Sequence, residues 1–229
     1  GFVNSGMMTL SSAVGIIMGA NLGTTFTAWL LSLSGMEGGA IWLEFLKPSF
    51  FSPIIAFLGI LFFLQKRNAS LKDVGAVLLG FSVLLGGMET MSAAAAPLAE
   101  SDFFRGMTAW FANPRIGLVF GILMTALLQS SSAAVGVLQA LTVTGGFTYA
   151  MAIPIVMGQN IGTCVTALLS GIGAQVNAKR AALVHLYFNV IGSAALMVLF
   201  AVLRGVIGRG FGGETADRAS IAAIHTVFN

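Results

Sequence analysis

One long stretch without charge limits what this chain can fold into. From Ile116 to Ala178 there is no Asp, Glu, Lys or Arg. A helical crossing of a bilayer core takes roughly 20 apolar residues, so this stretch can cross more than once. The whole chain is only 8% charged, whereas soluble domains carry about 25% charged residues. A transmembrane barrel would show short alternating segments instead. The sequence therefore predicts an all-α, polytopic integral membrane protein.

Apolar segments on either side of this stretch extend the prediction. We expect further spans at 48–65, 74–96 and 181–203, with a last helix starting near residue 219. The segment 1–36 is uncharged but rich in glycine, which weakens a helix interior, so we expect short or broken helices there. The net charge of +3 comes without a concentrated basic patch and gives no indication of nucleic-acid binding. The single cysteine, Cys164, excludes an internal disulfide and a cysteine-based metal cluster.

An internal repeat organises the chain. Residues 13–30 read AVGIIMGANLGTTFTAWL and residues 152–169 read AIPIVMGQNIGTCVTALL, with ten of eighteen positions identical. Gly6 and Thr9 match Gly145 and Thr148 at the same offset. A second short motif also recurs, as HLYFN at 185–189 and HTVFN at 225–229. Matching polar residues in apolar segments make chance a poor explanation, and a period of this kind points to a duplicated unit.

Two polar, glycine-interrupted elements stand out within the uncharged stretch. They are QSSS at 129–132 and GQNIGT at 158–163, and the first repeat holds GANLGT at 19–24. Water cannot satisfy such side chains inside a bilayer, so they must pair, line a wet cavity or hold a ligand. Breaks in duplicated membrane helices free N–H and C=O groups, and they mark the binding sites of secondary transporters. The competing interpretation is helix–helix packing through Ser and Gly. We expect the two elements to form one site.

At these residues the chain resembles the type II sodium–phosphate cotransporter family, whose members look like two repeats, each with QSSS followed by GxNxGT. The surrounding TALLQSSSA at 125–133 and GGMETMS at 86–92 also fit, and the similarity covers nearly the whole chain. The resemblance implies two inverted repeats with re-entrant or broken helices. Residues 1–72 would be the C-terminal part of repeat 1 with a connecting span, and 73–229 would be repeat 2 with the start of the next helix. The first QSSS does not occur, so we expect a chain incomplete at both ends, and a compact bacterial type.

The resemblance also implies a function and a site. It implies Na⁺-driven uptake of inorganic phosphate by alternating access in a bacterial inner membrane, with no cofactor beyond the coupling ion and with a possible homodimer. Na⁺ would be bound by Gln129, Ser130, Ser131, Asn160, Thr163 and backbone carbonyls. The substrate and ion site as a whole would comprise Gln129, Ser130, Ser131, Ser132, Asn160, Thr163, Thr166, Asn21, Thr24 and Thr27.

The residues themselves leave alternatives open. Phosphate carries about two negative charges near neutral pH, and a site without positive side chains cannot desolvate it alone, which favours a co-bound cation. The same reasoning fits sulfate or a small carboxylate. An intramembrane hydrolase using Ser130, Ser131 or Ser132 with His185 would lack a GxSxG elbow and an evident acid. A channel is the third alternative. For His185 and His225 we expect an interfacial hydrogen bond rather than proton coupling.

Overall fold

The computed structural model describes residues 1–33, 48–65, 68–95, 97, 101–208, 210 and 212–229. Its helices are α1 (Leu10–Ser32), α3 (Pro48–Phe63), α4 (Ala69–Ala95), α5 (Asp102–Trp110), α6 (Pro114–Leu128), α7 (Ser131–Thr142), α8 (Tyr149–Gly162), α9 (Cys164–Ser170), α10 (Val176–Ile207) and α11 (Arg218–Phe228). Among the described residues, β structure is limited to one isolated bridge between Thr148 and Thr215. The predicted all-α fold is confirmed.

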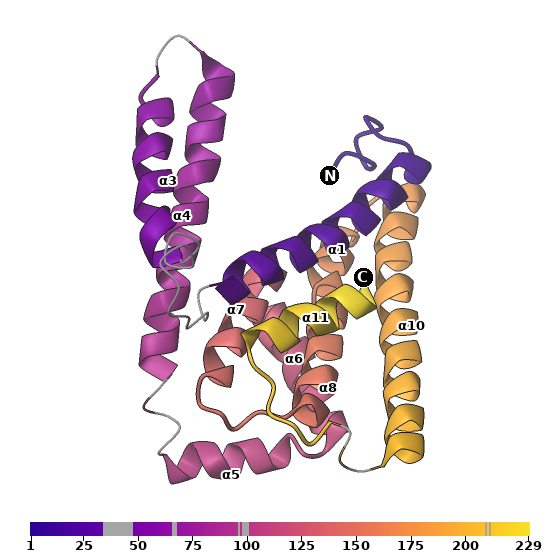
Figure 1. Cartoon of the computed structure of the whole chain (residues 1–229). Helices are drawn as coiled ribbons and strands as arrows, with labels where there is room; N and C mark the ends of the chain where they lie inside the picture. Colours follow the sequence, from indigo (N-terminus) through magenta and orange to yellow (C-terminus); the bar gives the residue numbers. More distant parts are fainter. Residues whose placement is uncertain (34–47, 66–67, 96, 98–100, 209, 211) are drawn as a thin grey trace.

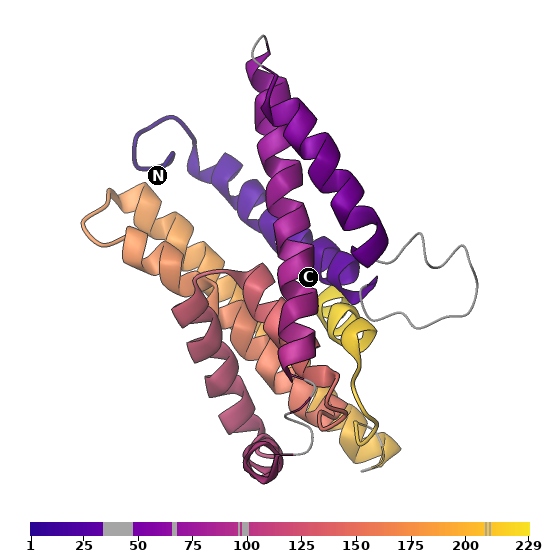
Figure 2. The ribbon, with the colours of Figure 1, turned by 90° about the vertical axis from the view of Figure 1, so that its left-hand side faces the viewer.

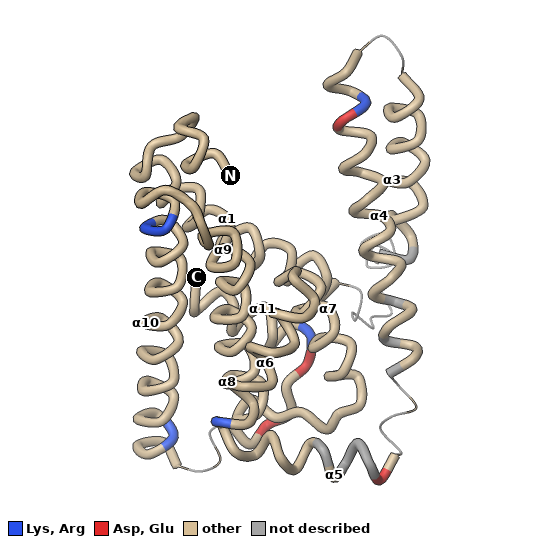
Figure 3. The backbone as a smooth tube through the Cα atoms, turned by 180° about the vertical axis from the view of Figure 1, so that it is seen from behind, with Lys and Arg blue, Asp and Glu red and all other residues tan. Residues whose placement is uncertain are grey.

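Within the part of the chain that the structure describes, four helical segments are long and apolar enough to cross a membrane, namely Leu10–Ser32, Ala69–Met88, Tyr149–Ser170 and Val176–Ile207. Shorter apolar helices, which include α6 and α7, lie between them. In Figure 3 the charged residues lie at the ends of α10, near the tip of the α3–α4 hairpin, at the start of α11 and at the lower end of the helices around α5. The long apolar helices confirm the prediction of a membrane protein.

The α3–α4 hairpin stands beside the remaining helices (Figures 1 and 2). Within the hairpin the hydroxyls of Ser52 and Ser82 hydrogen-bond to each other at 2.8 Å. Its contact with the other helices is apolar, because Leu85 and Met88 of α4 form a buried cluster with Leu31 of α1. The main core lies around α8, where Ile155, Val156 and Met157 are fully buried. The helix that carries the second GxNxGT element is therefore largely buried.

The expectation of broken helices in the first repeat is wrong for residues 10–32, which form one continuous helix. The hydroxyls of Thr24 and Thr27 donate to the carbonyls of Ala20 and Gly23, one turn earlier in the same helix. In a bilayer an unsatisfied backbone group costs several kcal/mol, more than the roughly 1 kcal/mol that a helical glycine costs relative to alanine. In the second copy the helix is interrupted at the GxNxGT element, since α8 ends at Gly162 and α9 begins at Cys164.

The two copies of the repeat share local structure as well as sequence. Gly6 and Gly145 both have a positive φ, at 76° and 67°, a conformation that favours glycine. Three residues later, Thr9 and Thr148 are both the N-cap residues of their helices. The segment before α1 lies beside the end of α9, where the Gln175 N–H donates to the Asn4 side chain at 2.8 Å. α1 runs down from the end of the bundle at which α10 begins, whereas α8 runs up toward that end (Figure 1). The two copies therefore run in opposite directions, as expected of inverted repeats. The division into 1–72 and 73–229 stays a prediction.

Candidate functional site

The QSSS element forms a sharp break between α6 and α7. Gln129 adopts the left-handed conformation (φ 54°, ψ 22°) and its N–H donates to the Thr125 carbonyl at 2.8 Å. Ser130 is extended and caps α7, with its hydroxyl accepting from the Ala133 N–H at 3.2 Å. The last carbonyls of α6 and the first N–H groups of α7 therefore meet at one place. Carbonyls suit a cation and a helix N-terminus suits an anion.

Opposite this break lies a cavity of about 260 Å³. At about 30 Å³ per water molecule it has room for roughly eight waters, enough for a small anion with its ions. Its walls come from both repeats and from α10. The lining residues are Ala20, Asn21, Thr24, Thr125, Gln129, Ser130, Ser131, Gly162, Thr163, Thr166 and His185.

Most of the residues proposed from the sequence meet at this cavity. The two repeats touch directly, since the Thr24 and Ser131 hydroxyls lie 3.3 Å apart. Asn21 of α1 is buried and its amide nitrogen has no hydrogen-bond partner. Thr163 and Thr166 line the opposite wall, with their hydroxyls donating to the carbonyls of the residues three positions earlier. Hydroxyls held by backbone carbonyls still expose oxygen lone pairs to the cavity.

Three proposed residues do not line the cavity, namely Ser132, Thr27 and Asn160. Ser132 is half-buried in the first turn of α7. Thr27 donates its hydroxyl to the Gly23 carbonyl at 3.0 Å. Asn160 is buried, and its amide nitrogen has no partner. A buried donor without a hydrogen bond costs about 1–3 kcal/mol of stability. A polar group that entered beside Asn160 would recover this energy by bonding to its amide nitrogen.

Two polar residues that we did not assign to the site also line it. Thr125 is almost completely buried, and its hydroxyl oxygen has no hydrogen-bond partner. Its backbone carbonyl accepts the N–H of Gln129 at 2.8 Å, so Thr125 lies in the last turn of α6 directly beside the break. His185 lines the cavity from α10. The sequence distance between His185 and the QSSS or GxNxGT element could not predict this, because only the tertiary fold brings α10 to the cavity.

The glycines of the second GxNxGT element serve packing. A Cβ added to Gly158 would lie 2.0 Å from the Leu118 carbonyl oxygen, and one added to Gly162 would lie 2.7 Å from the Ile122 carbonyl oxygen. Gly121 of α6 makes the reciprocal approach, with its Cβ position 2.1 Å from the Ile155 carbonyl oxygen. The packing interpretation is thus correct for the glycines, and this contact of α6 with α8 sets Thr163 opposite Gln129.

The electrostatic character of the cavity is set by neutral groups. No residue in its lining is Asp, Glu, Lys or Arg. The described residues contain no group of three His, Cys, Asp or Glu that could hold a metal ion. Any cation bound here would have to use hydroxyl, amide and carbonyl oxygens, which are the ligands of hard cations. Neutral donors and freed N–H groups are what this cavity offers an anion.

A comparison with known families decides which class of protein this is. The model of the Na⁺/Pi-cotransporter family matches residues 1–93 and again residues 83–212, one match for each part of the internal repeat. The chain belongs to the Na⁺/Pi-cotransporter family. A family of transporters agrees with a cavity between two repeats, and it gives no support to the hydrolase alternative. No solved structure matches the chain.

Among similar proteins, the chain is 29% identical to the uncharacterized protein YqeW of Bacillus subtilis, over 90% of this chain and 63% of that protein. It is 26% identical to the putative inorganic phosphate export protein YjbB of Escherichia coli, over 91% of this chain and 36% of that protein. It is 35% identical to the sodium-dependent phosphate transport protein 2A of Rattus norvegicus, over 59% of this chain and 24% of that protein. The chain therefore spans less than two thirds of each of these relatives.

The side chain of His225 does not form the interfacial hydrogen bond that we expected. His225 is 1% exposed and neither ring nitrogen has a hydrogen-bond partner. The backbone carbonyls of the motifs are used instead. Thr25 donates to the His225 carbonyl at 3.3 Å, and Cys164, its counterpart in the other Na⁺/Pi-cotransporter repeat, donates to the His185 carbonyl at 3.5 Å. Each repeat thus ties its GxNxGT helix to an HxxFN segment through the same position.

Proposed function

We propose that this chain forms the substrate-binding part of a Na⁺-coupled transporter of inorganic phosphate that works by alternating access. The observation that carries the proposal is the cavity that both repeats line, where the hydroxyls of Thr24 of one and Ser131 of the other lie 3.3 Å apart. Membership of the Na⁺/Pi-cotransporter family supports the choice of phosphate over sulfate or a carboxylate. The proposed location is a bacterial inner membrane.

Phosphate would be held by the hydroxyls and freed N–H groups at the start of α7. Ser131 and Ser132 are the first two residues of that helix, whose N–H groups have no intrahelical acceptor. The unpartnered amide nitrogens of Asn21 and Asn160 add buried donors near the same place. Donors that are already oriented lose little entropy on binding, and the helix dipole favours an anion there by up to about 1–2 kcal/mol.

Na⁺ would provide the positive charge that the cavity lacks. The proposed ligands are the oxygens of Gln129, Ser130, Ser131, Asn160 and Thr163, together with carbonyls freed at the end of α6. An uncompensated dianion in a poorly hydrated site is strongly unfavourable, so binding of phosphate and Na⁺ should be mutually dependent. A ligand changes a conformational equilibrium only by its different affinity for the two states. In this proposal only the loaded cavity closes.

The direction of transport is a separate question. An inward Na⁺ gradient would drive uptake, as we propose. The name of the E. coli relative, a putative inorganic phosphate export protein, favours export as a second candidate. Both use the same cavity, and a coupled carrier runs in whichever direction the combined gradients favour. The two are distinguished by imposing the Na⁺ gradient in each direction.

The deciding experiment is uptake of radiolabelled phosphate by proteoliposomes that contain the protein, with an inward Na⁺ gradient and then with K⁺ in its place. Ser131→Ala and Asn160→Ala should each lose accumulation. A matched control is Ser193→Ala, which removes a buried hydroxyl bonded to the Met157 carbonyl outside the cavity lining and should keep Na⁺-dependent uptake.

Three results would count against the proposal. Uptake that is indifferent to Na⁺ would remove the coupling. Equilibration of phosphate without accumulation against a gradient would indicate a channel. Accumulation of sulfate or a carboxylate in place of phosphate would keep the mechanism and change the substrate.

A further inference from the structure

A groove of about 480 Å³ runs along the second half of α10, where this helix passes the start of α6. We call it the α10 groove. Its lining on α10 begins at Met197 and continues three, four, seven, eight and eleven positions later, which is the spacing of one helix face. Pro114, the first residue of α6, also lines it. The α10 residues of the lining therefore face the groove from a single side of their helix.

The two ends of the groove differ in chemistry. Met197, Phe200 and Ala201 make one end apolar, and Arg204 lies at the other end, in the last turn of α10. Arg204 is half-buried, and within the described part of the chain it has no hydrogen bond or ion pair. No Asp or Glu is among the described residues that line the groove. An apolar wall that leads to an unpaired cation suits a molecule with an apolar tail and an anionic head.

The groove lies on a surface that a bilayer covers. α10 is 32 residues long and apolar enough to cross a membrane, and Arg204 stands three residues before its end at Ile207. Val198, Val202 and Val206, on the same stretch of α10, are all more than half exposed. Figure 3 shows a cation at this end of α10. Cations near the ends of spanning helices reach the level of the lipid headgroups, so the apolar end of the groove extends toward the acyl chains.

The two helix ends at the groove oppose each other electrostatically. The C-terminus of α10 carries a partial negative charge, and the N-terminus of α6, which begins at Pro114, carries a partial positive one. Arg204 therefore supplies the net charge of the lining. A single cation favours an anionic head over a zwitterionic one, whose own cation it repels. Basic pockets between membrane helices bind anionic lipid heads in this way.

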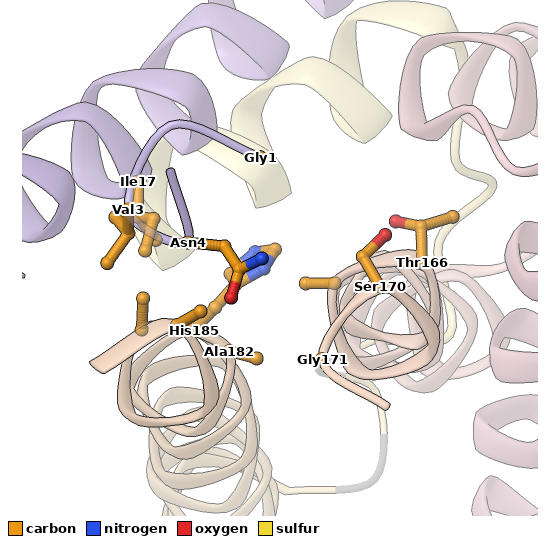
Figure 4. A pocket seen from close by; sticks show the side chains of 12 residues that line it. Gly1, Val3, Asn4, Ile17, Thr166, Ser170, Gly171, Ala182 and His185 are labelled. Atoms are coloured by element: carbon orange, nitrogen blue, oxygen red, sulfur yellow. The ribbon is translucent and has the colours of Figure 1, made fainter. Parts of the chain in front are cut away.

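The opposite end of α10 provides a contrast. A cavity of about 310 Å³ lies there beside α9 and the first turns of α10, and Figure 4 shows the side chains of Asn4, Ser170 and His185 around it. None of the described residues that line this cavity is Lys or Arg, since Lys179 is exposed on the first turn of α10 outside the lining. Of the two cavities along α10, the α10 groove is therefore the one that joins an apolar wall to a cation.

We propose that the α10 groove binds one anionic phospholipid of the surrounding bilayer. An acyl chain lies along Met197 and Ala201, and the lipid phosphate lies beside Arg204. Free inorganic phosphate could pair with Arg204 but would leave the apolar end without a partner, whereas a phospholipid satisfies both ends. The site is separate from the central cavity, and its occupant is a component of the membrane rather than the transported ion.

The test counts bound lipids by native mass spectrometry. The purified protein, in a non-ionic detergent, is titrated with phosphatidylglycerol or with phosphatidylcholine of the same acyl chains. Arg204→Gln removes the cation, and Lys179→Gln removes one from the other end of the same helix as its control. Ala201→Phe fills the apolar end of the groove, and Val202→Phe adds the same ring at the next residue, which is exposed outside the lining.

We expect phosphatidylglycerol to bind about fivefold more tightly than phosphatidylcholine, the effect of one cation near a lipid head. Arg204→Gln should remove this preference, and Arg204→Lys should keep it. Ala201→Phe should weaken binding of phosphatidylglycerol by at least roughly fourfold, the effect of one CH₂ group displaced from an apolar site. Lys179→Gln and Val202→Phe should bind both lipids as the unchanged protein does.

Equal binding of the two lipids by the unchanged protein would overturn the proposal, and so would an undiminished preference in Arg204→Gln or undiminished binding in Ala201→Phe. Displacement of phosphatidylglycerol by excess inorganic phosphate would indicate a simple anion site and would also overturn it. The unfolding midpoint of each variant shows whether it folds. If Arg204→Gln does not fold, the comparison of Ala201→Phe with Val202→Phe still decides. None of these measurements depends on transport, so a failure of the proposed function leaves the test intact.

Discussion

The contact between α6 and α8 should determine whether the site can form, and Gly158→Ala tests it. The added Cβ would lie 2.0 Å from the Leu118 carbonyl oxygen, whereas close C···O contacts are about 3.3 Å. The helices would have to separate by about 1.3 Å. Overpacking of this kind costs about 1–3 kcal/mol, while the better helix propensity of alanine returns up to about 1 kcal/mol. We expect a net loss of about 1–2 kcal/mol.

The loss is measured as the apparent unfolding midpoint of the purified protein in detergent. A change of about 1–2 kcal/mol lowers the midpoint of a chain of this size by roughly 2–8 °C. A displacement of about 1 Å at a positioned site costs up to about 100-fold in rate, so phosphate uptake should fall at least tenfold. Gly80→Ala is the control, because a Cβ there meets no atom within 4 Å, and its midpoint should stay or rise.

A Gly158→Ala protein with an unchanged midpoint and normal uptake would refute this account of the packing. Gly121→Ala tests the same contact from α6, where the added Cβ would lie 2.1 Å from the Ile155 carbonyl oxygen of α8. The two variants should have similar effects. If only one of them is tolerated, the helices approach by another face than the one described.

Three further predictions concern single side chains. Thr125→Val removes a buried hydroxyl that has no partner, so it should leave the unfolding midpoint nearly unchanged. It should raise the Na⁺ or phosphate concentration for half-maximal uptake, and Thr125→Ser should restore it. Unchanged concentrations would show that Thr125 is not part of the site. Thr24→Val and Ser131→Ala should show a coupling of about 0.5–1.5 kcal/mol in a double-mutant cycle of phosphate binding, whereas strictly additive effects would contradict their contact. The hydroxyl of Ser220 donates to Asp217 at 2.6 Å and lowers the pKa of this carboxyl. The Asp217 cap therefore stabilises α11 fully above the unfolded pKa near 4, and this stabilisation is lost as the pH falls through the folded pKa. Asp217→Asn should flatten the fall of the unfolding midpoint on acidification below pH 4, and an equally steep fall in both proteins would contradict this.

The break at QSSS could be predicted from the sequence because its cause is local. Four hydrogen-bonding side chains follow an apolar segment without water to satisfy them, and Ser is among the preferred N-cap residues. The structure places Ser130 as that cap and Gln129 in the left-handed conformation before it. Thr9 and Thr148 are equally local, since each stands just before an apolar helix. Signals of this kind need no knowledge of the rest of the fold.

The two glycine-rich elements show where such reasoning ends. Gly158 and Gly19 occupy the same position of the repeat, but Gly158 touches α6 whereas a Cβ on Gly19 would meet no atom within 4 Å. The sequence is nearly identical around both, so only the neighbouring helix decides whether glycine serves close packing. The same holds for Thr125, whose place in the cavity depends on its distance from Gly162 rather than on its own motif.

The conserved geometry of the repeat lies in its hydrogen bonds more than in its side-chain identities. Thr25 and Cys164 differ in chemistry, yet each donates to the backbone carbonyl of a histidine that begins an HxxFN segment. Asn229 donates to the Thr25 hydroxyl at 2.7 Å, and Asn189 donates to the His185 carbonyl at 2.9 Å. The His225 carbonyl also accepts the backbone N–H of Asn229 at 2.9 Å. A carbonyl oxygen has two lone pairs, so any short side chain with a proton can add a second bond to it. The two repeats can therefore diverge at this position while holding their GxNxGT helices at the same distance from the cavity between them.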